Sequence, residues 1–177
     1  MKPITAKEKA KAEAALTEEE KRKATCCFTG HRPEGLRRSV DDIKVDLENE
    51  ILASITAGYC TFITGMAAGV DLWAGCIVAR LRDRFPDLKL IAAVPYPDFR
   101  EMWDAAWQEK YDRILRTANH VEIIVREYKP GIYQLRNEWM VDHSSKVIAV
   151  YNWKASGTRN TINYAKRNGI PVQYIKA

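Results

Sequence analysis

The sequence predicts an α/β fold with three layers, in which helices cover both faces of a mostly parallel sheet of about six strands. Two observations predict it. From Ala24 onward, short apolar runs alternate with stretches whose apolar residues recur every three or four positions. The length of 177 residues suits one domain with a substantial core. We therefore expect a charged arm or helix over residues 1–23, followed by one domain over residues 24–177.

Short runs rich in β-branched and other apolar residues predict the strands. These runs occupy residues 25–29, 59–64, 89–94, 121–125, 147–151 and 172–175. Because helical stretches separate them, we expect the strands to lie parallel in a Rossmann-like α/β/α arrangement.

Apolar residues at helical spacing predict five helices between these strands. They are Val40, Ile43, Leu47, Ile51 and Ile55, then Trp73, Ile77 and Leu81, then Trp103, Trp107, Tyr111 and Leu115, then Leu135 and Trp139, and finally Ile162 and Ala165. Gly169 and Pro171 fit a helix end before the last strand. The aromatic residues in these helices could form a base-stacking surface, but packing against the sheet is the favoured interpretation.

Composition limits the partners and the compartment. No apolar run approaches the roughly 18 residues that span a bilayer, and the charged N-terminal residues lack the apolar core of a secretion signal, so we expect a cytoplasmic protein without a membrane partner. The net charge of +5 favours an anionic partner. Because the basic residues are dispersed along the helices, nucleic acid is allowed but not favoured.

The four cysteines, Cys26, Cys27, Cys60 and Cys76, show neither C-x-x-C spacing nor a nearby histidine pair. Cys26, Cys27 and Cys60 fall in predicted strands and Cys76 in a predicted helix, where cysteine acts as a small apolar residue. We therefore expect no metal site.

Polar and glycine-rich segments follow the predicted strands, where parallel sheets bind ligands. These segments are residues 29–33, 64–71, 94–97, 126–137 and 151–158. The second runs through Gly65 and Gly69 into a helix, so its backbone N–H groups could hold a phosphate. It is neither G-x-G-x-x-G nor G-x-x-x-x-G-K-[ST], and a turn that merely packs tightly stays the alternative. Ser156, Gly157 and Thr158 predict a second helix start with free backbone donors.

Charged side chains adjoin these segments. Arg32, Arg136 and Arg159 could each hold a phosphate through two parallel hydrogen bonds, although any one of them could instead be a surface charge. Asp71 lies in the first turn of its helix, where it could cap the helix, accept hydrogen bonds from ribose hydroxyls or act as a general base. His31 could titrate near neutral pH, but by itself it identifies no acid or base.

The motifs T-G-H-R-P at 29–33, T-G-M-A-A-G-V-D at 64–71, R-N at 136–137 and G-T at 157–158 resemble the YpsA family of the SLOG superfamily. That superfamily also includes the DNA-processing protein DprA and the LOG-type phosphoribohydrolases. The resemblance implies a Rossmann-like fold and a nucleotide or ADP-ribose-like ligand. The resemblance also implies which residues contact this ligand: Gly30, Arg32, Gly65, Gly69, Asp71, Arg136, Asn137, Gly157 and Thr158.

One departure bears on activity. The LOG-type enzymes carry P-G-G-x-G-T-x-x-E, whereas residues 154–161 here read K-A-S-G-T-R-N-T, so Thr161 stands at the position of the catalytic glutamate. We therefore do not transfer the hydrolase activity to this chain.

These observations leave three functions. The favoured one is a nucleotide-binding protein, which the resemblance suggests is a sensor in stress or phage-related signalling, with no cofactor required. The alternatives are an enzyme that cleaves an N-glycosidic bond with Asp71 as acid or base, and a DprA-like DNA-binding protein. Assembly into a homo-oligomer is left open. The predicted ligand-binding residues are Thr29, Gly30, His31, Arg32, Thr64, Gly65, Gly69, Asp71, Tyr96, Arg136, Asn137, Ser156, Gly157 and Thr158.

Overall fold

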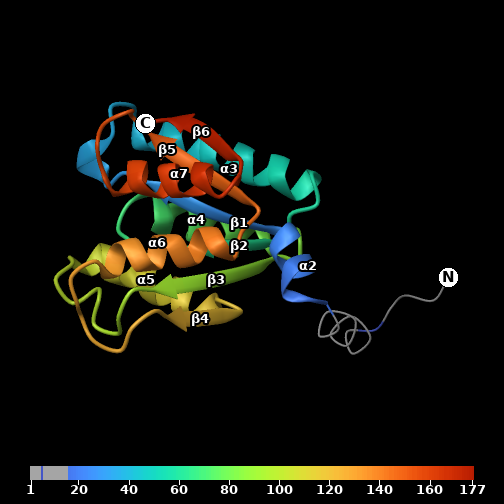
Figure 1. Cartoon of the computed structure of the whole chain (residues 1–177), viewed down its shortest axis with the longest axis horizontal. Coiled ribbons are helices and arrows are strands. Elements are labelled where there is room, and N and C mark those ends of the chain that lie inside the picture. The colour runs from blue at the N-terminus through green and yellow to red at the C-terminus, as the bar shows by residue number, and fades with distance from the viewer. Residues whose placement is uncertain (1–4, 6–15) are drawn as a thin grey trace.

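A six-stranded, entirely parallel sheet forms the centre of the molecule (Figure 1). The computed structural model describes residue 5 and residues 16–177, so most of the predicted arm over residues 1–23 lies outside the described residues. The strand order is β4-β3-β2-β1-β5-β6. The strands are β1 Thr25–Gly30, β2 Thr61–Thr64, β3 Lys89–Val94, β4 His120–Ile123, β5 Lys146–Tyr151 and β6 Val172–Lys176.

Helices cover both faces of this sheet, as the sequence predicts. The covering helices are α3 Val40–Thr56, α4 Val70–Leu81, α5 Ala105–Thr117, α6 Ile132–Asp142 and α7 Gly157–Arg167. The short helix α2 Glu18–Lys23 precedes β1, and a 3-10 turn η1 lies at Pro33–Gly35. One core joins the sheet to α3, α4 and α5. A second core joins the opposite face to α6 and α7. The α/β/α prediction is therefore confirmed.

The strands serve both cores because side chains alternate between the faces of a strand. In β1, Cys26 and Phe28 belong to the first core and Cys27 to the second. In β5, Ile148 belongs to the first core and Val147 to the second. Buried on both faces, these central strands have the nearly continuous apolar sequence of parallel sheets.

Three predicted positions differ from the structure. Cys60 lies just before β2 rather than in it, because its N–H and that of Thr61 both donate to the carbonyl of Ala24 (3.0 and 3.1 Å) and the regular ladder starts only afterwards. The fourth strand begins at His120 and ends at Ile123. Trp103 precedes α5, because Asp104 caps this helix by accepting from the N–H of Trp107.

The strand order creates a crevice at one position. The chain builds outward from β1 to β4 and then returns to the other side of β1 with β5. The loops that leave the carboxyl ends of β1 and β5 therefore diverge to opposite faces of the sheet. Such a switch point is where open parallel sheets bind ligands.

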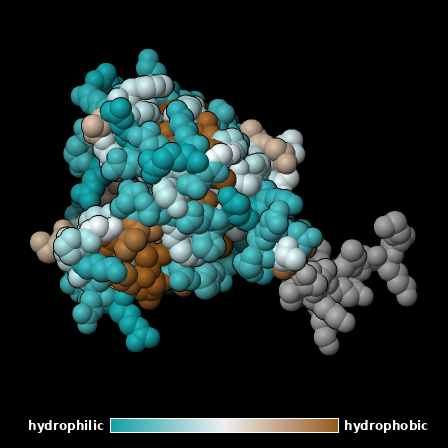
Figure 2. All heavy atoms as spheres, in the orientation of Figure 1, coloured by the Kyte–Doolittle hydropathy of each residue, from teal (hydrophilic) through white to brown (hydrophobic). Residues whose placement is uncertain are grey.

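A large apolar patch lies over the β4 edge of the sheet on the face drawn in Figure 2. Val121 and Ile123 of this edge strand are 37% and 47% exposed. Among the described residues, no helix combines the length and the apolar character that crossing a membrane would require.

Candidate functional site

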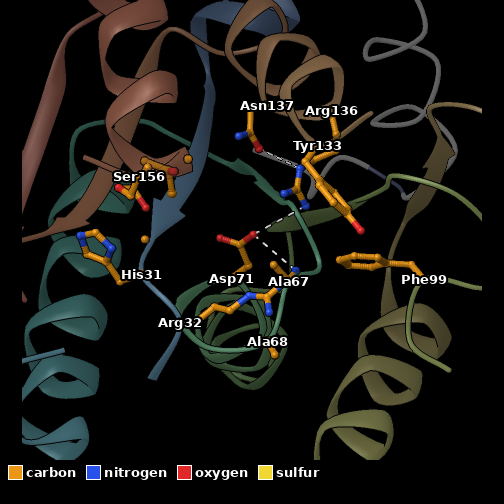
Figure 3. Close-up of a pocket in the computed structure, with 14 residues that line it drawn as sticks. His31, Arg32, Ala67, Ala68, Asp71, Phe99, Tyr133, Arg136, Asn137 and Ser156 are labelled. Carbon is orange, nitrogen blue, oxygen red and sulfur yellow. Dashed lines mark hydrogen bonds and ion pairs between the residues drawn. The ribbon is translucent and has the colours of Figure 1, made fainter. Parts of the chain in front are cut away.

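A pocket of about 340 Å³ opens at the crevice between the carboxyl ends of β1 and β5 (Figure 3). The predicted residues that line it are Thr29, Gly30, His31, Arg32, Asp71, Arg136, Asn137, Ser156, Gly157 and Thr158. Ala67, Ala68, Phe99 and Tyr133 complete the lining. Segments that are far apart in the sequence thus meet around one cavity.

The loop after β1 is tied to the loop after β5 through His31. The His31 side chain is buried, and its ring stacks on Tyr151 with the centroids 5.6 Å apart. Its Nε2 accepts a hydrogen bond from the backbone N–H of Asn152 (3.2 Å). Burial lowers the pKa of His31 and so favours the neutral ring, which can act as this acceptor. His31 therefore positions the loop that leads to α7.

The loop between β2 and α4 is held tightly against the same region. The Thr64 hydroxyl donates to the carbonyl of Asp71 (2.7 Å) and fixes the start of α4 over the end of β2. Gly69 has φ 104° and ψ −130°, a conformation that essentially only glycine adopts. A Cβ atom at Gly69 would lie 2.9 Å from the carbonyl oxygen of His31. This glycine thus lets the β2–α4 loop contact the β1 loop directly.

Asp71 lies at the centre of the pocket, in the first turn of α4 (Figure 3). Its Oδ2 accepts from the N–H of Ala67 (3.4 Å) and lies 3.8 Å from Nη1 of Arg136. Burial raises the pKa of this carboxyl to about 6, and the attraction of Arg136 opposes the shift. The carboxylate is therefore mostly ionised at pH 7, with its second oxygen directed away from these partners.

Arg136 is a buried side chain that is already bound within the protein. Its side chain is 7% exposed, its Nη1 donates to the carbonyl of Gly65, and its Nε donates to Oδ1 of Asn137 (2.8 Å). Burial is the main effect on its pKa and lowers it, while Asp71 favours the charged form. Arg136 therefore fixes the Gly65 turn and the Asp71 carboxylate, and it is not the free surface charge that the sequence left open.

Arg32 differs from Arg136 in both exposure and partners. It is exposed and lines the pocket, and its side chain has no hydrogen bond or ion pair with the residues that the structure describes. No side chain caps the start of α4 at Gly69, and at the start of α7 Ser156 accepts only from the N–H of Arg159 (3.3 Å). A free guanidinium and two helix N-termini together favour an anion in this part of the pocket.

The remaining predicted residues lie near the pocket without lining it. Thr64 and Gly65 support Asp71 and Arg136 from behind, and Gly69 shapes the loop. Tyr96 contacts Phe99 ring to ring, with the centroids 5.6 Å apart. Arg159 is exposed and outside the lining.

The sequence reasoning missed four lining residues. Ala67 and Ala68 lie inside the glycine-rich segment 64–71, where only their small size indicates that a ligand could approach the backbone closely. Phe99 and Tyr133 come from the β3–α5 loop and the first turn of α6. No local pattern distinguishes these two aromatic residues from those of the core.

Thr161 stands where the LOG-type enzymes carry a glutamate, and its hydroxyl is bound within its own helix. The side chain is buried, and its hydroxyl donates to the carbonyl of Gly157 (3.0 Å) within α7.

Within the described part of the chain, no three His, Cys, Asp or Glu side chains are gathered as ligands for a metal ion.

Comparison with known proteins shows the family of this chain. The family model YpsA, described as the YspA SLOG family, matches residues 26–177. An SPbeta prophage-derived protein, YoqJ of Bacillus subtilis (strain 168), is 36% identical over 118 residues, which cover 60% of this chain and 69% of the relative. A UPF0398 protein of Bacillus cereus (strain B4264) is 31% identical over 150 residues, which cover 80% of this chain and 82% of the relative.

Two solved structures of DNA processing protein A share the fold. The protein from Streptococcus pneumoniae has a TM-score of 0.54 and 21% identity, covering 86% of this chain and 50% of that chain. The protein from Helicobacter pylori, described for its single-stranded DNA binding mode, has a TM-score of 0.59 and 18% identity, covering 86% of this chain and 65% of that chain. This chain thus spans between half and two thirds of these neighbours.

Proposed function

The chain belongs to the YspA SLOG family, and from this membership and the pocket geometry we propose that it binds a nucleotide or a nucleotide-derived phosphate such as ADP-ribose. One observation carries the proposal. The pocket at the switch point of the sheet combines an arginine side chain that is unpaired among the described residues, two helix N-termini and a central carboxylate. Its volume of about 340 Å³ lies at the lower end of the range for small-molecule sites, which favours a nucleotide-sized ligand.

The phosphate is assigned to the side of the pocket formed by Arg32 and by the starts of α4 and α7. The N–H groups of Gly157 and Thr158 belong to the first turn of α7, where a helix has no intrahelical partners for its donors. Arg32 adds a positive charge that no protein carboxylate neutralises among the described residues. A phosphate there would gain charge-assisted hydrogen bonds of the strong kind.

The sugar is assigned to Asp71. A carboxylate accepts hydrogen bonds from both hydroxyls of a ribose, as acidic residues do in many nucleotide sites. Oδ2 of Asp71 already accepts from Ala67, whereas no described residue donates to Oδ1. Arg136 keeps the carboxylate ionised near neutral pH, so that it is ready to accept.

Binding without turnover fits the residues better than hydrolysis does, because Thr161 replaces the glutamate of the LOG-type enzymes and its hydroxyl is used within α7. We extend the proposal to a sensor of nucleotides in stress or phage-related signalling, which the prophage-derived relative supports. A cytoplasmic location and assembly into a homo-oligomer stay predictions.

Cleavage of an N-glycosidic bond is the second candidate, and the pKa of Asp71 favours it. A carboxyl with a pKa raised to about 6 is suited to exchange protons near neutral pH. In this case Asp71 would activate a water molecule or protonate the leaving base beside the sugar.

Single-stranded DNA is the third candidate, since the Helicobacter pylori neighbour is described for binding it. Against it stands the size of the pocket, which suits one nucleotide, and the dispersal of basic residues over the helices.

A thermal-shift screen separates these candidates. The probes are AMP, ADP-ribose, NAD, a cyclic dinucleotide and an oligodeoxythymidine. A ligand that binds only the native state at a hundred times its Kd should stabilise the protein by about 2.7 kcal/mol. Stabilisation by a mononucleotide or ADP-ribose, lost in Arg32→Ala, supports the proposal. Stabilisation by the oligonucleotide alone would favour the DNA-binding alternative.

Asp71→Asn then separates binding from catalysis, because it keeps the shape and removes the charge. If Asp71 only binds ribose, affinity should fall by about 1 to 3 kcal/mol. If it is a general base, binding should largely survive while turnover falls about a hundredfold or more. Calorimetry measures the first effect, and chromatography of released base or ribose phosphate measures the second. Unchanged affinity and no turnover in either protein would leave Asp71 as a helix cap.

A further inference from the structure

One wall of the pocket is aromatic. Phe99 and Tyr133 both line the cavity, and their ring centroids lie 5.7 Å apart. Phe99 comes from the loop after β3 and Tyr133 from the first turn of α6. Neither ring is required by the phosphate and sugar contacts proposed above.

Phe99 is a fixed support. It is 6% exposed and is packed edge-on against Trp103 and Tyr96, with centroid distances of 4.9 and 5.6 Å. Trp103 in turn contacts the buried Tyr111 of α5 (5.7 Å). The Phe99 ring is therefore anchored to the core by a chain of aromatic contacts.

Tyr133 differs because much of its ring is open to solvent. It is 41% exposed and is part of neither core among the described residues. It is nevertheless held in place, by Phe99 on one side and by Tyr128 at 6.5 Å on another. The Tyr133 ring therefore lines the pocket although neither core requires an aromatic residue at this position.

The aromatic wall and the start of α7 lie on different sides of the pocket, and Arg136 and Asn137 lie beside Tyr133 (Figure 3). In Figure 3, His31 and Ser156 lie on one side of Asp71, and Phe99 and Tyr133 lie on the other. Arg32 lies on the same level as Ala68, below the carboxylate. A ligand that satisfies all three regions is anionic at one end, has hydroxyl groups in the middle and is planar and apolar at the other end.

We propose that Tyr133, supported by Phe99, stacks on the base of the bound nucleotide, so that the pocket selects ligands with an aromatic base over sugar phosphates and favours purines over pyrimidines. This inference rests on the proposed function and adds the ligand class and its orientation. Stacking on an aromatic side chain depends on ring area and tolerates different bases. A purine offers the larger ring system to the wall.

The experiment compares AMP, CMP and ribose 5-phosphate as probes in titration calorimetry on the full chain. A base stacked on one aromatic side chain contributes about 1 to 3 kcal/mol, which corresponds to a factor of about 5 to 150 in Kd. We expect AMP to bind within this range more tightly than ribose 5-phosphate, with CMP between them.

Tyr133→Ala should remove most of the advantage of AMP and leave the Kd of ribose 5-phosphate unchanged, whereas Tyr133→Phe should keep the advantage because the ring remains. Tyr128→Ala is the matched control. Tyr128 touches Tyr96 and Tyr133 and is 62% exposed, but it does not line the pocket. It should retain the preference for AMP. Both positions are exposed enough for the variants to fold, which the melting temperature verifies.

The outcomes separate this inference from the proposed function. Equal affinities for AMP and ribose 5-phosphate, or an AMP preference that survives Tyr133→Ala, would overturn the stacking wall and leave phosphate binding intact. Equal losses in Tyr133→Ala and Tyr128→Ala would assign both rings to loop packing and overturn it as well. No binding of AMP, CMP, ribose 5-phosphate or ADP-ribose would overturn both proposals.

Discussion

Cavities of different size and chemistry lie at the two ends of the parallel strands, which we call the amino edge and the carboxyl edge of the sheet. At the amino edge, a cavity of about 640 Å³ is lined by the starts of four strands, including Thr25, Thr61, Lys89 and His120. At the carboxyl edge, the pocket around Asp71 has only about 340 Å³. The larger hollow is not the better candidate site, because its polar groups lie mainly at the surface.

Charge burial is what distinguishes the two edges. At the amino edge, Lys21 pairs with Glu18 at 2.8 Å, and the two side chains are 44% and 84% exposed. At the carboxyl edge, Arg136 and Asp71 are 7% and 10% exposed. Burying two charges costs more desolvation free energy than forming an ion pair at the surface. The buried pair lies beside the glycine turn at Gly69, whose backbone conformation is also unfavourable for other residues. Buried charges with shifted pKa values in a pocket are a feature of functional sites.

The sharpest way to break this comparison is to remove one charge at each edge. Arg136→Met leaves the Asp71 carboxylate buried without its partner and should lower the free energy of unfolding by about 3 to 5 kcal/mol. Lys21→Met removes a surface pair and should produce no resolvable change. Urea denaturation at pH 8 measures both.

The pH dependence of Arg136→Met provides a further check. The folded pKa of Asp71 is raised above that of an ordinary aspartate, so ionising this buried group lowers stability as the pH rises from about 4 to about 6. Without Arg136 this pKa should rise further, and the loss in Arg136→Met should shrink when the pH is lowered from 8 to 5. Equal losses of unfolding free energy in Arg136→Met and Lys21→Met would contradict the interpretation of Arg136 and Asp71 as a buried ion pair. A loss in Arg136→Met that does not change with pH would contradict it as well.

A smaller effect is expected from the glycine turns. Gly69→Ala introduces a strained backbone conformation and brings Cβ to 2.9 Å from the His31 carbonyl, so we expect a loss of about 2 to 4 kcal/mol. Gly58 has φ 96°, and a Cβ atom added there would meet nothing within 4 Å, so Gly58→Ala should cost only the backbone strain, about 1 to 2 kcal/mol. Thermal unfolding compares the two. Equal losses would show that the β2–α4 loop does not need its close contact with the β1 loop.

The affinity for the ligand should depend on pH through Asp71, the buried carboxyl group of the carboxyl edge. If the ionised form of Asp71 accepts the ribose hydroxyls, a pKa of about 6 means that the ionised fraction falls about tenfold between pH 7 and pH 5. The affinity for AMP should fall by a similar factor. Asp71→Asn serves as the control, because the phosphate of the ligand also titrates near pH 6. Calorimetry that shows the same pH dependence in both proteins would assign it to the ligand alone.

The smallest effect on stability is expected at Gly157. This residue is the first of α7, and a Cβ atom there would meet nothing within 4 Å. Gly157→Ala should therefore leave the melting temperature unchanged or raise stability by about 0.4 to 1 kcal/mol. Gly157 lines the pocket at the helix start proposed to bind the phosphate, so the added methyl group should lower the affinity for AMP. A variant that keeps full affinity would contradict the assignment of the phosphate to the start of α7.

The sequence by itself determined the elements and much of the carboxyl edge. Strand and helix positions follow from apolar periodicity, which depends on neighbours a few residues apart, as in the helix that carries Ile43 and Leu47. The turn at Gly65 and Gly69, the helix start at Ser156 and the position of Asp71 after a strand are equally local. The family resemblance, which the family match confirms, rests on the same short motifs.

Only the tertiary structure decided how these parts share one pocket. The β5 loop adjoins the β1 loop because β5 pairs with β1 after the chain has built three other strands, and no local pattern encodes this pairing. The same long-range packing directs Arg136 inward onto the Gly65 carbonyl, while the side chain of Arg32 has no partner in the described part of the chain. It also brings Phe99 and Tyr133 to the pocket and leaves Tyr96 behind them. Burial and partners belong to the assembled core, so residue type and spacing alone could not assign these roles.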